Sequence, residues 1–390
     1  MKNIRDVVIV AYGRSPITRA TKGALASERP TKYATEVLKG VLKRVDRLPL
    51  EDIDDIVVGC ATPEDVQGKN VARIIAQRAG LPDSVPAQTI NRFCSSGLQS
   101  IAIGANAIMV NQADVIVAGG VESMSMLPMF VTDSSTLDPW LTKNNSAIYT
   151  PMGITAENVA SQYDVTRASM DEFAVKSHQK AAKAQSEGAF RREIIPVTYM
   201  DREGKEQILE HDEGIRGDST TEVLAALRTV FKEEGGTVTA GNASSVNDGA
   251  AFVVLMSADK AKELNIKPIA KYLGYAVAGV DPAIMGVGPI YAIPKLMEKI
   301  NMSTDQFDVI ELNEAFAAQA IPCIKELNLD ESKVNPRGGA IALGHPLGAT
   351  GANLVCKALS YLEDTKGKYA LISMCIGGGM GAAGAFEMIS

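Results

Sequence analysis

Short apolar runs alternate with amphipathic stretches over the first 120 residues. The runs VVIV at 7–10 and IVVG at 56–59 have the length and composition of buried strands. Between them, residues 32–45 repeat apolar side chains at helical spacing, and one face of this helix would hold Tyr33, Val37, Leu38, Val41, Leu42 and Val45. This order predicts an α/β unit with a parallel sheet that is buried on both faces.

The alternation stops after Gly120 and resumes near residue 250. The segment 121–247 is polar and rich in loops, with one clear helix predicted from about Thr166 to Gly188. The apolar run AAFVVLMS at 250–257 then restarts a pattern that continues to the end of the chain. We therefore predict an N-terminal α/β half at 1–120, completed by about 248–265, an inserted loop domain at 121–247, and a C-terminal α/β half at 266–390.

The two flanks also resemble each other in the order of their features. A strand that begins at Asp55 is followed 39 residues later by Cys94, and one that begins at Asp308 is followed 37 residues later by His345. In each flank a glycine follows three residues on, before a helix of small residues and a strand that ends in glycines. Chance similarity between α/β units is the alternative, but the matched positions favour an internal duplication. A duplication would place Cys94 and His345 at equivalent helix N-termini.

Length and charge limit the classes of function. A chain of 390 residues, of which 46% are hydrophobic, is long enough for two cores. A net charge of -7 argues against nucleic acid and against an anionic membrane surface, because both attract an excess of Lys and Arg. The chain start lacks a signal-peptide pattern, and no apolar stretch is long enough to span a membrane. We therefore expect a cytoplasmic protein.

The cysteines and histidines are few and scattered. Five cysteines without a CxxC pair predict free thiols, and no spacing of Cys and His suggests a zinc site, so we expect no bound metal. Of the three histidines, His178 would lie in mid-helix and His211 lies within the acidic stretch LEHDEG. Both are predicted to be solvated.

Two turns between a strand and a helix hold residues suited to nucleophilic catalysis. Cys94, in TINRFCSSGLQS, lies at a helix N-terminus, where unpaired N–H groups and the helix dipole lower the pKa of a thiol. A buried core thiol is the alternative. His345, in GGAIALGHPLGATG, lies in a glycine-rich turn and precedes Pro346, a favourable first residue of a helix. If Cys94 is a nucleophile, His345 is its predicted partner.

Two further candidates follow strands in the C-terminal half. Cys375 ends a strand and enters a turn of glycines whose N–H groups can face a ligand, although a core thiol is again the alternative. The same stretch contains GxGxxG, but the six residues AFEMIS that follow Gly384 are more typical of a last strand than of the helix in a dinucleotide site. Asn313, in VIELNEAFAAQA, could cap a helix or hold a water or a substrate oxygen.

Together these four stretches resemble the motifs of the thiolase family. NRFCSSGLQS is similar to the family's nucleophile motif, NEAFA to its asparagine motif, GGAIALGHPLGATG to its histidine motif and SMCIGGGMGAA to its C-terminal cysteine motif. The motifs occur in the family's order over essentially the whole chain. Further similarity at PMGITAENVA, DEGIR, TVTAGNASSVNDGAA and IMGVGPIYAIP is closer to degradative 3-ketoacyl-CoA thiolases than to the biosynthetic type.

The resemblance implies the thiolase fold, in which two duplicated α/β halves form α-β-α-β-α layers and carry an inserted loop domain. It implies that Cys94 is the acylated nucleophile, His345 the base that activates it, and Cys375 the acid and base at the substrate α-carbon. Asn313 would hold a water that forms one oxyanion hole with His345. The backbone N–H groups of Cys94 and Gly377 would form the other.

The resemblance also implies coenzyme A as a substrate, with no permanently bound cofactor. The residues that match contacts to CoA are Met152, Arg216, Ala243, Ser244, Met285 and Phe316. Three residues depart from common patterns of the family, namely Pro151, where biosynthetic members often have histidine, Ser245 and Arg337. Pro151 supports the degradative type, whereas Ser245 and Arg337 leave open the CoA contacts and the access to the histidine turn.

The implied reaction is a reversible retro-Claisen cleavage of 3-ketoacyl-CoA to acetyl-CoA and a shortened acyl-CoA through acyl-Cys94, with the alkoxide in the pocket of His345 and its water. A biosynthetic acetoacetyl-CoA thiolase is the alternative within the family. A non-catalytic acyl-CoA or lipid carrier on the same scaffold is the alternative from another class. The family also implies a homodimer or homotetramer and is compatible with association with other enzymes of β-oxidation.

Overall fold

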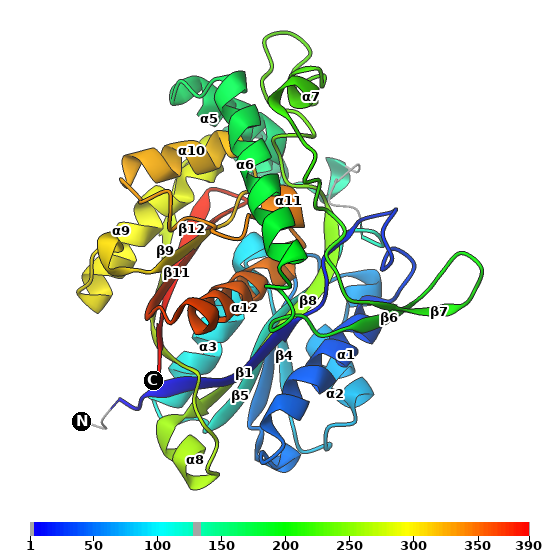
Figure 1. Ribbon diagram of the computed structural model, residues 1–390, viewed down its shortest axis with the longest axis vertical. Coiled ribbons are helices and arrows are strands. Elements are labelled where there is room, and N and C mark those ends of the chain that lie inside the picture. Colours follow the sequence, from blue (N-terminus) through cyan, green and yellow to red (C-terminus); the bar gives the residue numbers. More distant parts are fainter. Residues whose placement is uncertain (1–3, 128–133, 390) are drawn as a thin grey trace.

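The computed structural model describes residues 4–127 and 134–389 (Figure 1). In this part of the chain ten strands form one sheet. Its first half contains, in spatial order, β1 (Val7–Arg14), β8 (Asn247–Ser257), β5 (Val115–Ser123), β3 (Asp55–Gly59) and β4 (Ala87–Ile90), and the short β2 (Thr18–Arg19) pairs with β8. β3 is parallel to β4 and β5, whereas β8 is antiparallel to β5 and β1.

The second half of the sheet repeats this pattern of directions. Its spatial order is β9 (Ala270–Gly279), β12 (Met380–Met388), β11 (Tyr369–Ile376) and β10 (Val309–Leu312). β10 is parallel to β11, and β12 is antiparallel to β11 and β9. The predicted duplication is therefore confirmed, but the prediction of a parallel sheet was wrong. Each half is mixed, because β8 and β12 run back antiparallel beside β5 and β11.

The helices complete five layers, as predicted (Figure 1). One outer layer, α1 (Pro30–Leu42) and α2 (Val71–Ala79), packs on the first half of the sheet. The other outer layer, α9 (Gly288–Ile300) and α10 (Ala317–Glu326), packs on the second half. Between the two halves lie α3 (Ser96–Met109) and α12 (Leu347–Thr365), which share one apolar core with strands of both halves. The strands are apolar on both faces because helices cover both faces.

Glycines let the two central helices approach closely. A Cβ atom added at Gly97 of α3 would lie 2.9 Å from the carbonyl oxygen of Gly348 in α12, and one added at Gly351 would lie 2.3 Å from the backbone nitrogen of Leu98. Any larger residue would push the helices apart. This contact brings the N-termini of α3 and α12 together, and the turns before them contain Cys94 and His345.

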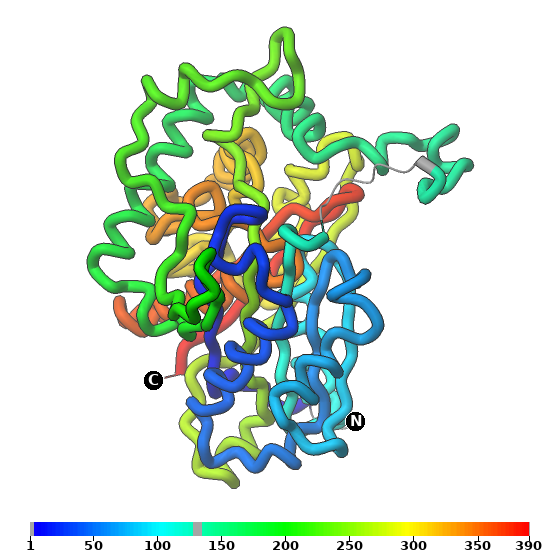
Figure 2. Tube along the Cα trace, turned by 90° about the vertical axis from the view of Figure 1, so that its right-hand side faces the viewer, coloured from blue at the N-terminus to red at the C-terminus, as the bar shows by residue number. Residues whose placement is uncertain are grey.

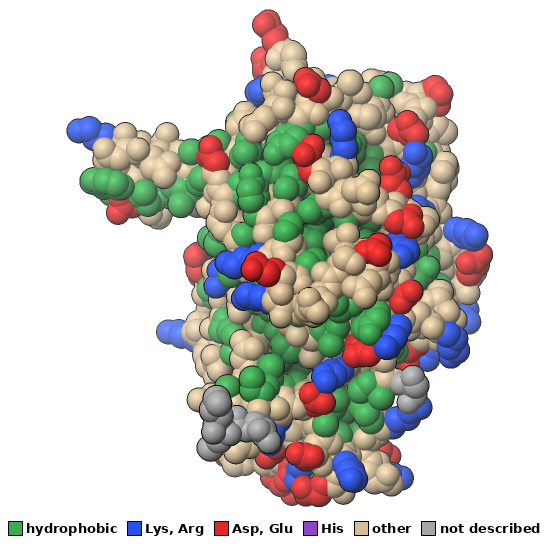
Figure 3. All heavy atoms as spheres, turned by 90° about the vertical axis from the view of Figure 1, so that its left-hand side faces the viewer, with side chains coloured by type: hydrophobic (Ala, Val, Ile, Leu, Met, Phe, Trp, Pro, Cys, Tyr) green, Lys and Arg blue, Asp and Glu red, His purple; other side chains and the backbone are tan. Residues whose placement is uncertain are grey.

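Most of the described part of the segment between β5 and β8 lies over the top of this core, in teal and green in Figure 2. Its described elements are α4 (Pro139–Asn144), α5 (Met152–Gln162), α6 (Arg167–Ser186), the hairpin of β6 (Val197–Met200) and β7 (Glu206–Leu209), and α7 (Thr221–Ala225). An arm with apolar side chains projects from the molecule (Figure 3). Trp140, in α4, is 67% exposed. The chain also forms the short helices α8 (Ala258–Glu263) and α11 (Ala340–Leu343). None of the helices described here is long and apolar enough to cross a membrane.

A buried ion cluster fastens this segment to the core. Arg14, at the end of β1, is 1% exposed. Its guanidinium donates two hydrogen bonds to Asp212, at 2.8 and 2.9 Å, and one to Glu193 at 2.8 Å. Asp212 also accepts the N–H of Ile17 at 2.7 Å. A buried charge that loses its partner is costly, so the cluster specifies where residues 193–212 meet β1.

Replacing Arg14 with methionine should therefore lower the free energy of unfolding by about 3–5 kcal/mol, because Asp212 and Glu193 would stay buried without the guanidinium that pairs with both. Urea-induced unfolding measures this change. Lys176→Met is the matched control, since Lys176 forms a pair with Glu172 at 2.7 Å in which both side chains are more than half exposed. The control should cost at most about 1 kcal/mol. Equal effects of the two substitutions would contradict this account of the cluster.

Candidate active site

A sharp turn places Cys94 at the start of α3. The chain leaves β4 at Ile90, forms a 3-10 turn over Phe93–Ser95 and enters the helix at Ser96. Phe93 has a φ of 43°, a left-handed conformation that is uncommon for a bulky residue. The Ser96 hydroxyl stabilises the turn by accepting the N–H of Arg92 at 2.9 Å and donating to the carbonyl of Phe93 at 2.7 Å. The turn points Cys94 inward, where it is 9% exposed.

The Cys94 thiol lies among apolar side chains and backbone N–H groups. It packs with Ala61, Met124 and Leu347, and Leu347 is the first residue of α12. Burial raises the pKa of the thiol to about 11, while hydrogen bonds from the N–H groups of Gly377 and of Cys94 itself oppose this rise. The predicted lowering of the pKa by the helix N-terminus was therefore wrong. The cost of desolvating a thiolate exceeds the stabilisation that the helix end provides.

This raised pKa has a measurable consequence in the His345→Gln variant, which lacks the imidazole predicted to be the partner of Cys94. The rate at which iodoacetamide alkylates Cys94 follows the thiolate fraction, so it should keep rising with pH above 9.0, the ordinary value for a thiol, toward about 11. Peptide mass spectrometry at each pH measures the rate, with N-acetylcysteine as the control for the reagent. A rate that levels off at or below pH 9.0 would mean that the thiol is not desolvated as described.

Cys375 lies at the end of β11 and is fully buried. Burial raises its pKa well above the usual range, and the neighbouring thiols of Cys94 and Cys323 raise it further. The turn that follows requires glycine, because Gly379 has a φ of 83° and a Cβ atom there would lie 2.2 Å from the carbonyl oxygen of Val280. The structure thus brings the thiols of Cys94 and Cys375 and the N–H of Gly377 together. The raised pKa means that Cys375 is protonated at neutral pH.

His345 lies in the turn between α11 and α12 and is 5% exposed. Its backbone N–H donates to Oδ1 of Asn247 at 2.8 Å, which ties the turn to β8. The imidazole Nδ1 lies 2.6 Å from the hydroxyl of Thr350, and Nε2 lies 3.4 Å from Nδ2 of Asn313. Burial lowers the pKa of His345 to about 4, so the ring is neutral at pH 7 and can accept a proton. Pro346 precedes α12 as its cap instead of being its first helical residue.

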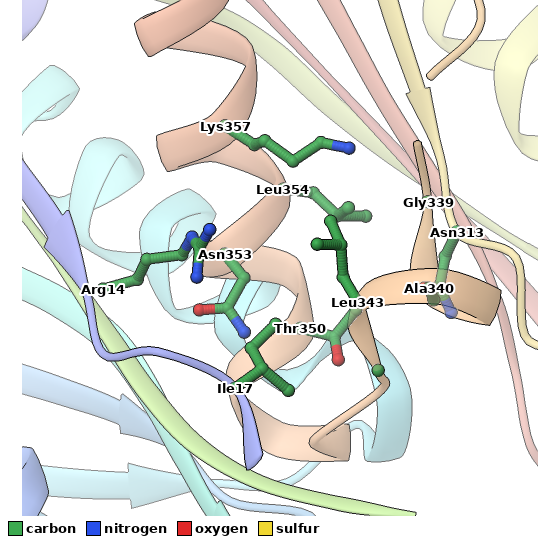
Figure 4. A pocket seen from close by; sticks show the side chains of 11 residues that line it. Arg14, Ile17, Asn313, Gly339, Ala340, Leu343, Thr350, Asn353, Leu354 and Lys357 are labelled. Carbon is green, nitrogen blue, oxygen red and sulfur yellow. The ribbon is translucent and has the colours of Figure 1, made fainter. Parts of the chain in front are cut away.

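Asn313 follows β10 at the edge of the sheet where Cys375 also lies. Its backbone N–H donates to the carbonyl of Ser373 in β11 at 2.9 Å, so adjacent strand ends position Asn313 and Cys375. The side chain is buried, and its Oδ1 has no hydrogen-bond partner in residues 4–127 and 134–389. Asn313 also lines a small cavity of about 20 Å³ that lies beside the histidine turn and is lined by Thr350 and Asn353 as well (Figure 4).

Glu122 is a central residue that the sequence analysis missed. It is 1% exposed at the end of β5, and its carboxylate accepts the N–H groups of Ala61 and Gly348 at 2.8 and 2.9 Å and the side-chain amide of Gln67 at 2.8 Å. It therefore links the loop after β3 to the first turn of α12. An acidic residue two positions after Gly120, where the predicted apolar strand ends, was the available signal.

Five of the six predicted CoA contacts lie near Cys375. The backbone of Ala243 pairs with that of Phe316, and the N–H of Ser244 donates to the carbonyl of Ala315 at 2.9 Å. Met152 begins α5, with its sulfur 3.5 Å from where a Cβ atom of Gly377 would lie. Met285 and Phe316 are buried in the same apolar cluster as Cys375.

Arg216, the sixth predicted contact, is exposed on a loop that is hydrogen-bonded to a histidine. Its backbone N–H donates to Nδ1 of His178 at 3.1 Å. His178 is 6% exposed, so the prediction that it is solvated was wrong. The helix α6 turns this side chain toward the loop at 211–219, a contact that helical periodicity alone does not show. His211 is exposed, as predicted.

The three departures from the family pattern are accommodated locally. Pro151 caps α5, and the Ser245 hydroxyl donates to Oδ1 of Asn247 at 3.0 Å. Arg337 is 8% exposed and donates to Asp364 at 2.5 Å and to the Ser360 hydroxyl at 3.2 Å, both on α12. The guanidinium of Arg337 is therefore hydrogen-bonded to the C-terminal part of α12.

Comparisons with known proteins agree over the whole chain. Residues 7–259 match the family described as "Thiolase, N-terminal domain" and residues 266–388 match "Thiolase, C-terminal domain". The chain is 46% identical to the 3-ketoacyl-CoA thiolase of Bacillus subtilis and 45% identical to the β-ketoadipyl-CoA thiolase of Pseudomonas aeruginosa, covering 99% of this chain and 100% of each relative. The crystal structure of the Bacillus anthracis acetyl-CoA acetyltransferase superposes with a TM-score of 0.92 at 40% identity, covering 100% of both chains.

The fold and these likenesses first define a class: the protein is an acyltransferase enzyme with two duplicated α/β halves. Within that class, the chain belongs to the thiolase family.

Proposed function

We propose that the protein cleaves 3-ketoacyl-CoA to acetyl-CoA and a shortened acyl-CoA through an acyl-Cys94 intermediate. The observation that carries this proposal is that the buried thiols of Cys94 and Cys375 lie beside the N–H of Gly377. Cys94 lies at the N-terminus of α3, which packs against α12, the helix that follows His345. A nucleophile, a proton donor and oxyanion donors are the groups that a thioester exchange requires.

The first step is nucleophilic attack by Cys94. The neutral imidazole of His345 takes the thiol proton, and the sulfur forms a bond to the 3-keto carbon of the substrate. The bond between Cα and Cβ then breaks, which leaves an acyl-thioester on Cys94 and the enolate of acetyl-CoA. Because burial raises the pKa of Cys94, a base that accepts the proton during attack is needed at neutral pH.

The geometry favours a different use of the two oxyanion sites from the one predicted. The alkoxide forms on the carbon bonded to the Cys94 sulfur, and the N–H groups of Cys94 and Gly377 already hydrogen-bond to that sulfur. They are therefore placed to stabilise the alkoxide, with each donor contributing about 3–4 kcal/mol. Asn313 and the protonated His345 would stabilise the enolate oxygen of the leaving acetyl-CoA.

Cys375 would then donate its proton to the enolate carbon and release acetyl-CoA. Its raised pKa keeps the thiol protonated until that step. The resulting Cys375 thiolate takes the proton from an incoming CoA thiol, whose sulfur attacks the acyl group on Cys94. The tetrahedral intermediate collapses, the shortened acyl-CoA leaves, and Cys94 recovers its proton from His345. Protons balance over the cycle, and the kinetics should be ping-pong.

CoA would act as a substrate and would lie between α5 and the β-bridge that joins Ala243 to Phe316. The exposed Arg216 would lie near the nucleotide. Two observations support the degradative type. Pro151 stands where biosynthetic members often have histidine, and the B. subtilis relative is named 3-ketoacyl-CoA thiolase. A homodimer or homotetramer in the cytoplasm, associated with other β-oxidation enzymes, completes the proposal.

Thiolysis rates on acetoacetyl-CoA and on longer 3-ketoacyl-CoA esters test this function. The degradative proposal expects kcat/KM on a medium-chain ester to equal or exceed that on acetoacetyl-CoA. Activity on acetoacetyl-CoA alone would favour the biosynthetic alternative. CoA binding without turnover of any ester would favour the non-catalytic carrier.

A further inference from the structure

Thr350, one turn into α12, connects the His345 ring to the backbone of its own turn. Its Oγ1 lies 2.6 Å from Nδ1 of His345 and 2.9 Å from the carbonyl oxygen of Pro346. Thr350 is 2% exposed, and Figure 4 shows it on α12 at the wall of the small cavity beside the histidine turn. The mechanism above assigns no role to this residue.

The two contacts together favour one position for the imidazole proton. A carbonyl oxygen can only accept, so the single hydroxyl proton of Thr350 is donated to Pro346. The Thr350 oxygen must then accept in its contact with His345, which means that Nδ1 carries the ring proton. Burial keeps the ring neutral, because it lowers the pKa of His345 to about 4. Nε2 therefore has the free lone pair.

The contact on the other side of the ring is consistent with this tautomer. Nε2 lies 3.4 Å from Nδ2 of Asn313, and an amide NH₂ group can only donate. Of the two ring nitrogens, Nε2 faces Asn313 and Nδ1 faces back into α12. Only in the tautomer protonated at Nδ1 can Nε2 accept a hydrogen bond from the Asn313 amide.

We propose that Thr350 is a positioning residue that fixes the tautomer and the ring orientation of His345. This inference rests on the proposed function in one respect, namely that Nε2 is the base for Cys94. Without the hydroxyl, Nδ1 would have no acceptor, and the tautomer protonated at Nε2 would become populated. In that tautomer the ring cannot take the Cys94 proton through Nε2, so the fraction of enzyme in that tautomer loses base catalysis, as in catalytic triads whose histidine has the wrong tautomer.

Thr350→Val and Thr350→Ser test this proposal. Valine keeps the branched shape and removes the hydroxyl, whereas serine keeps the hydroxyl. Thr35→Val is the matched control, since Thr35 is 4% exposed in α1 and its hydroxyl donates to the carbonyl of Thr31 at 2.7 Å, four residues back in the sequence. The control removes the same type of helix contact away from His345.

The first measurement is ¹⁵N NMR of the imidazole nitrogens after selective labelling of the three histidines, with His345→Gln to assign the signal. The wild type and Thr350→Ser should show a protonated Nδ1 and an unprotonated Nε2. Thr350→Val should show a mixture or the opposite tautomer. An unchanged tautomer in Thr350→Val would overturn the proposal, and this result does not depend on whether the protein is active.

The second measurement is steady-state thiolysis of acetoacetyl-CoA. Thr350→Val should lower kcat by about 10- to 100-fold with little change in KM for CoA, and Thr350→Ser should restore most of it. Thr35→Val should retain wild-type kcat. If Thr350→Val and Thr35→Val lose stability equally and keep the same kcat, Thr350 has only a structural role. If the wild type itself shows no thiolysis, the proposed function fails, while the NMR result still decides the tautomer.

Discussion

Replacing Cys94 with alanine should abolish thiolysis, with a fall in kcat of about 10⁴-fold or more on any 3-ketoacyl-CoA, because the acyl group would have no sulfur to bond to. Cys375 should not replace this nucleophile, because burial and the neighbouring thiols of Cys94 and Cys323 raise its pKa well above the usual range. Steady-state kinetics with acetoacetyl-CoA and CoA measure the loss.

Cys356→Ala is the matched control for this loss. Cys356 is also a free, fully buried cysteine, and it lies in the middle of α12 within the central core. It should keep kcat close to the wild-type value, although the cavity that it leaves will cost stability. Thiolysis retained by Cys94→Ala would mean that the nucleophile has been misassigned.

Replacing Cys375 with serine should separate the two halves of the reaction. A hydroxyl neither donates a proton to the enolate carbon nor deprotonates CoA as well as a thiol does, so overall turnover should fall by about 10²–10⁴-fold. Acetylation of Cys94 by acetyl-CoA requires attack by Cys94 but no proton transfer at the α-carbon. It should therefore be slowed much less than turnover.

Single-turnover acetylation and steady-state thiolysis, measured on the same preparation, distinguish these effects. Cys356→Ser controls for placing a hydroxyl at a buried cysteine. Equal losses of acetylation and turnover in Cys375→Ser would assign Cys375 a role in shaping the site and would contradict its role in proton transfer.

The architecture could be predicted from the sequence because the two halves of the chain repeat the same order of features. Matched spacings at Asp55 and Asp308 predicted that Cys94 and His345 precede equivalent helices, and α3 and α12 lie side by side between the two halves of the sheet. The directions of the strands could not be predicted in the same way. An apolar run that is buried on both faces has the same pattern whether it is parallel or antiparallel to its neighbour, so β8 and β12 gave no sign of their direction.

The electrostatics of the candidate site could not be predicted from local sequence. The rule that a helix N-terminus lowers the pKa of a thiol neglected burial by Met124 and Leu347, which are distant from Cys94 in the sequence. Glu122 and His178 were missed for a related reason. Each polar group is buried because its partners come from other elements, and those pairings exist only once the chain has folded.

The most direct test of the central claim is mass spectrometry of the peptide that contains Cys94 after brief incubation with acetyl-CoA and acid quench. One acetyl group is expected on Cys94, which CoA should remove and which should be absent in Cys94→Ala. An unmodified Cys94 in an enzyme that turns over acetoacetyl-CoA, or an acetyl group on Cys375 instead, would contradict the central claim.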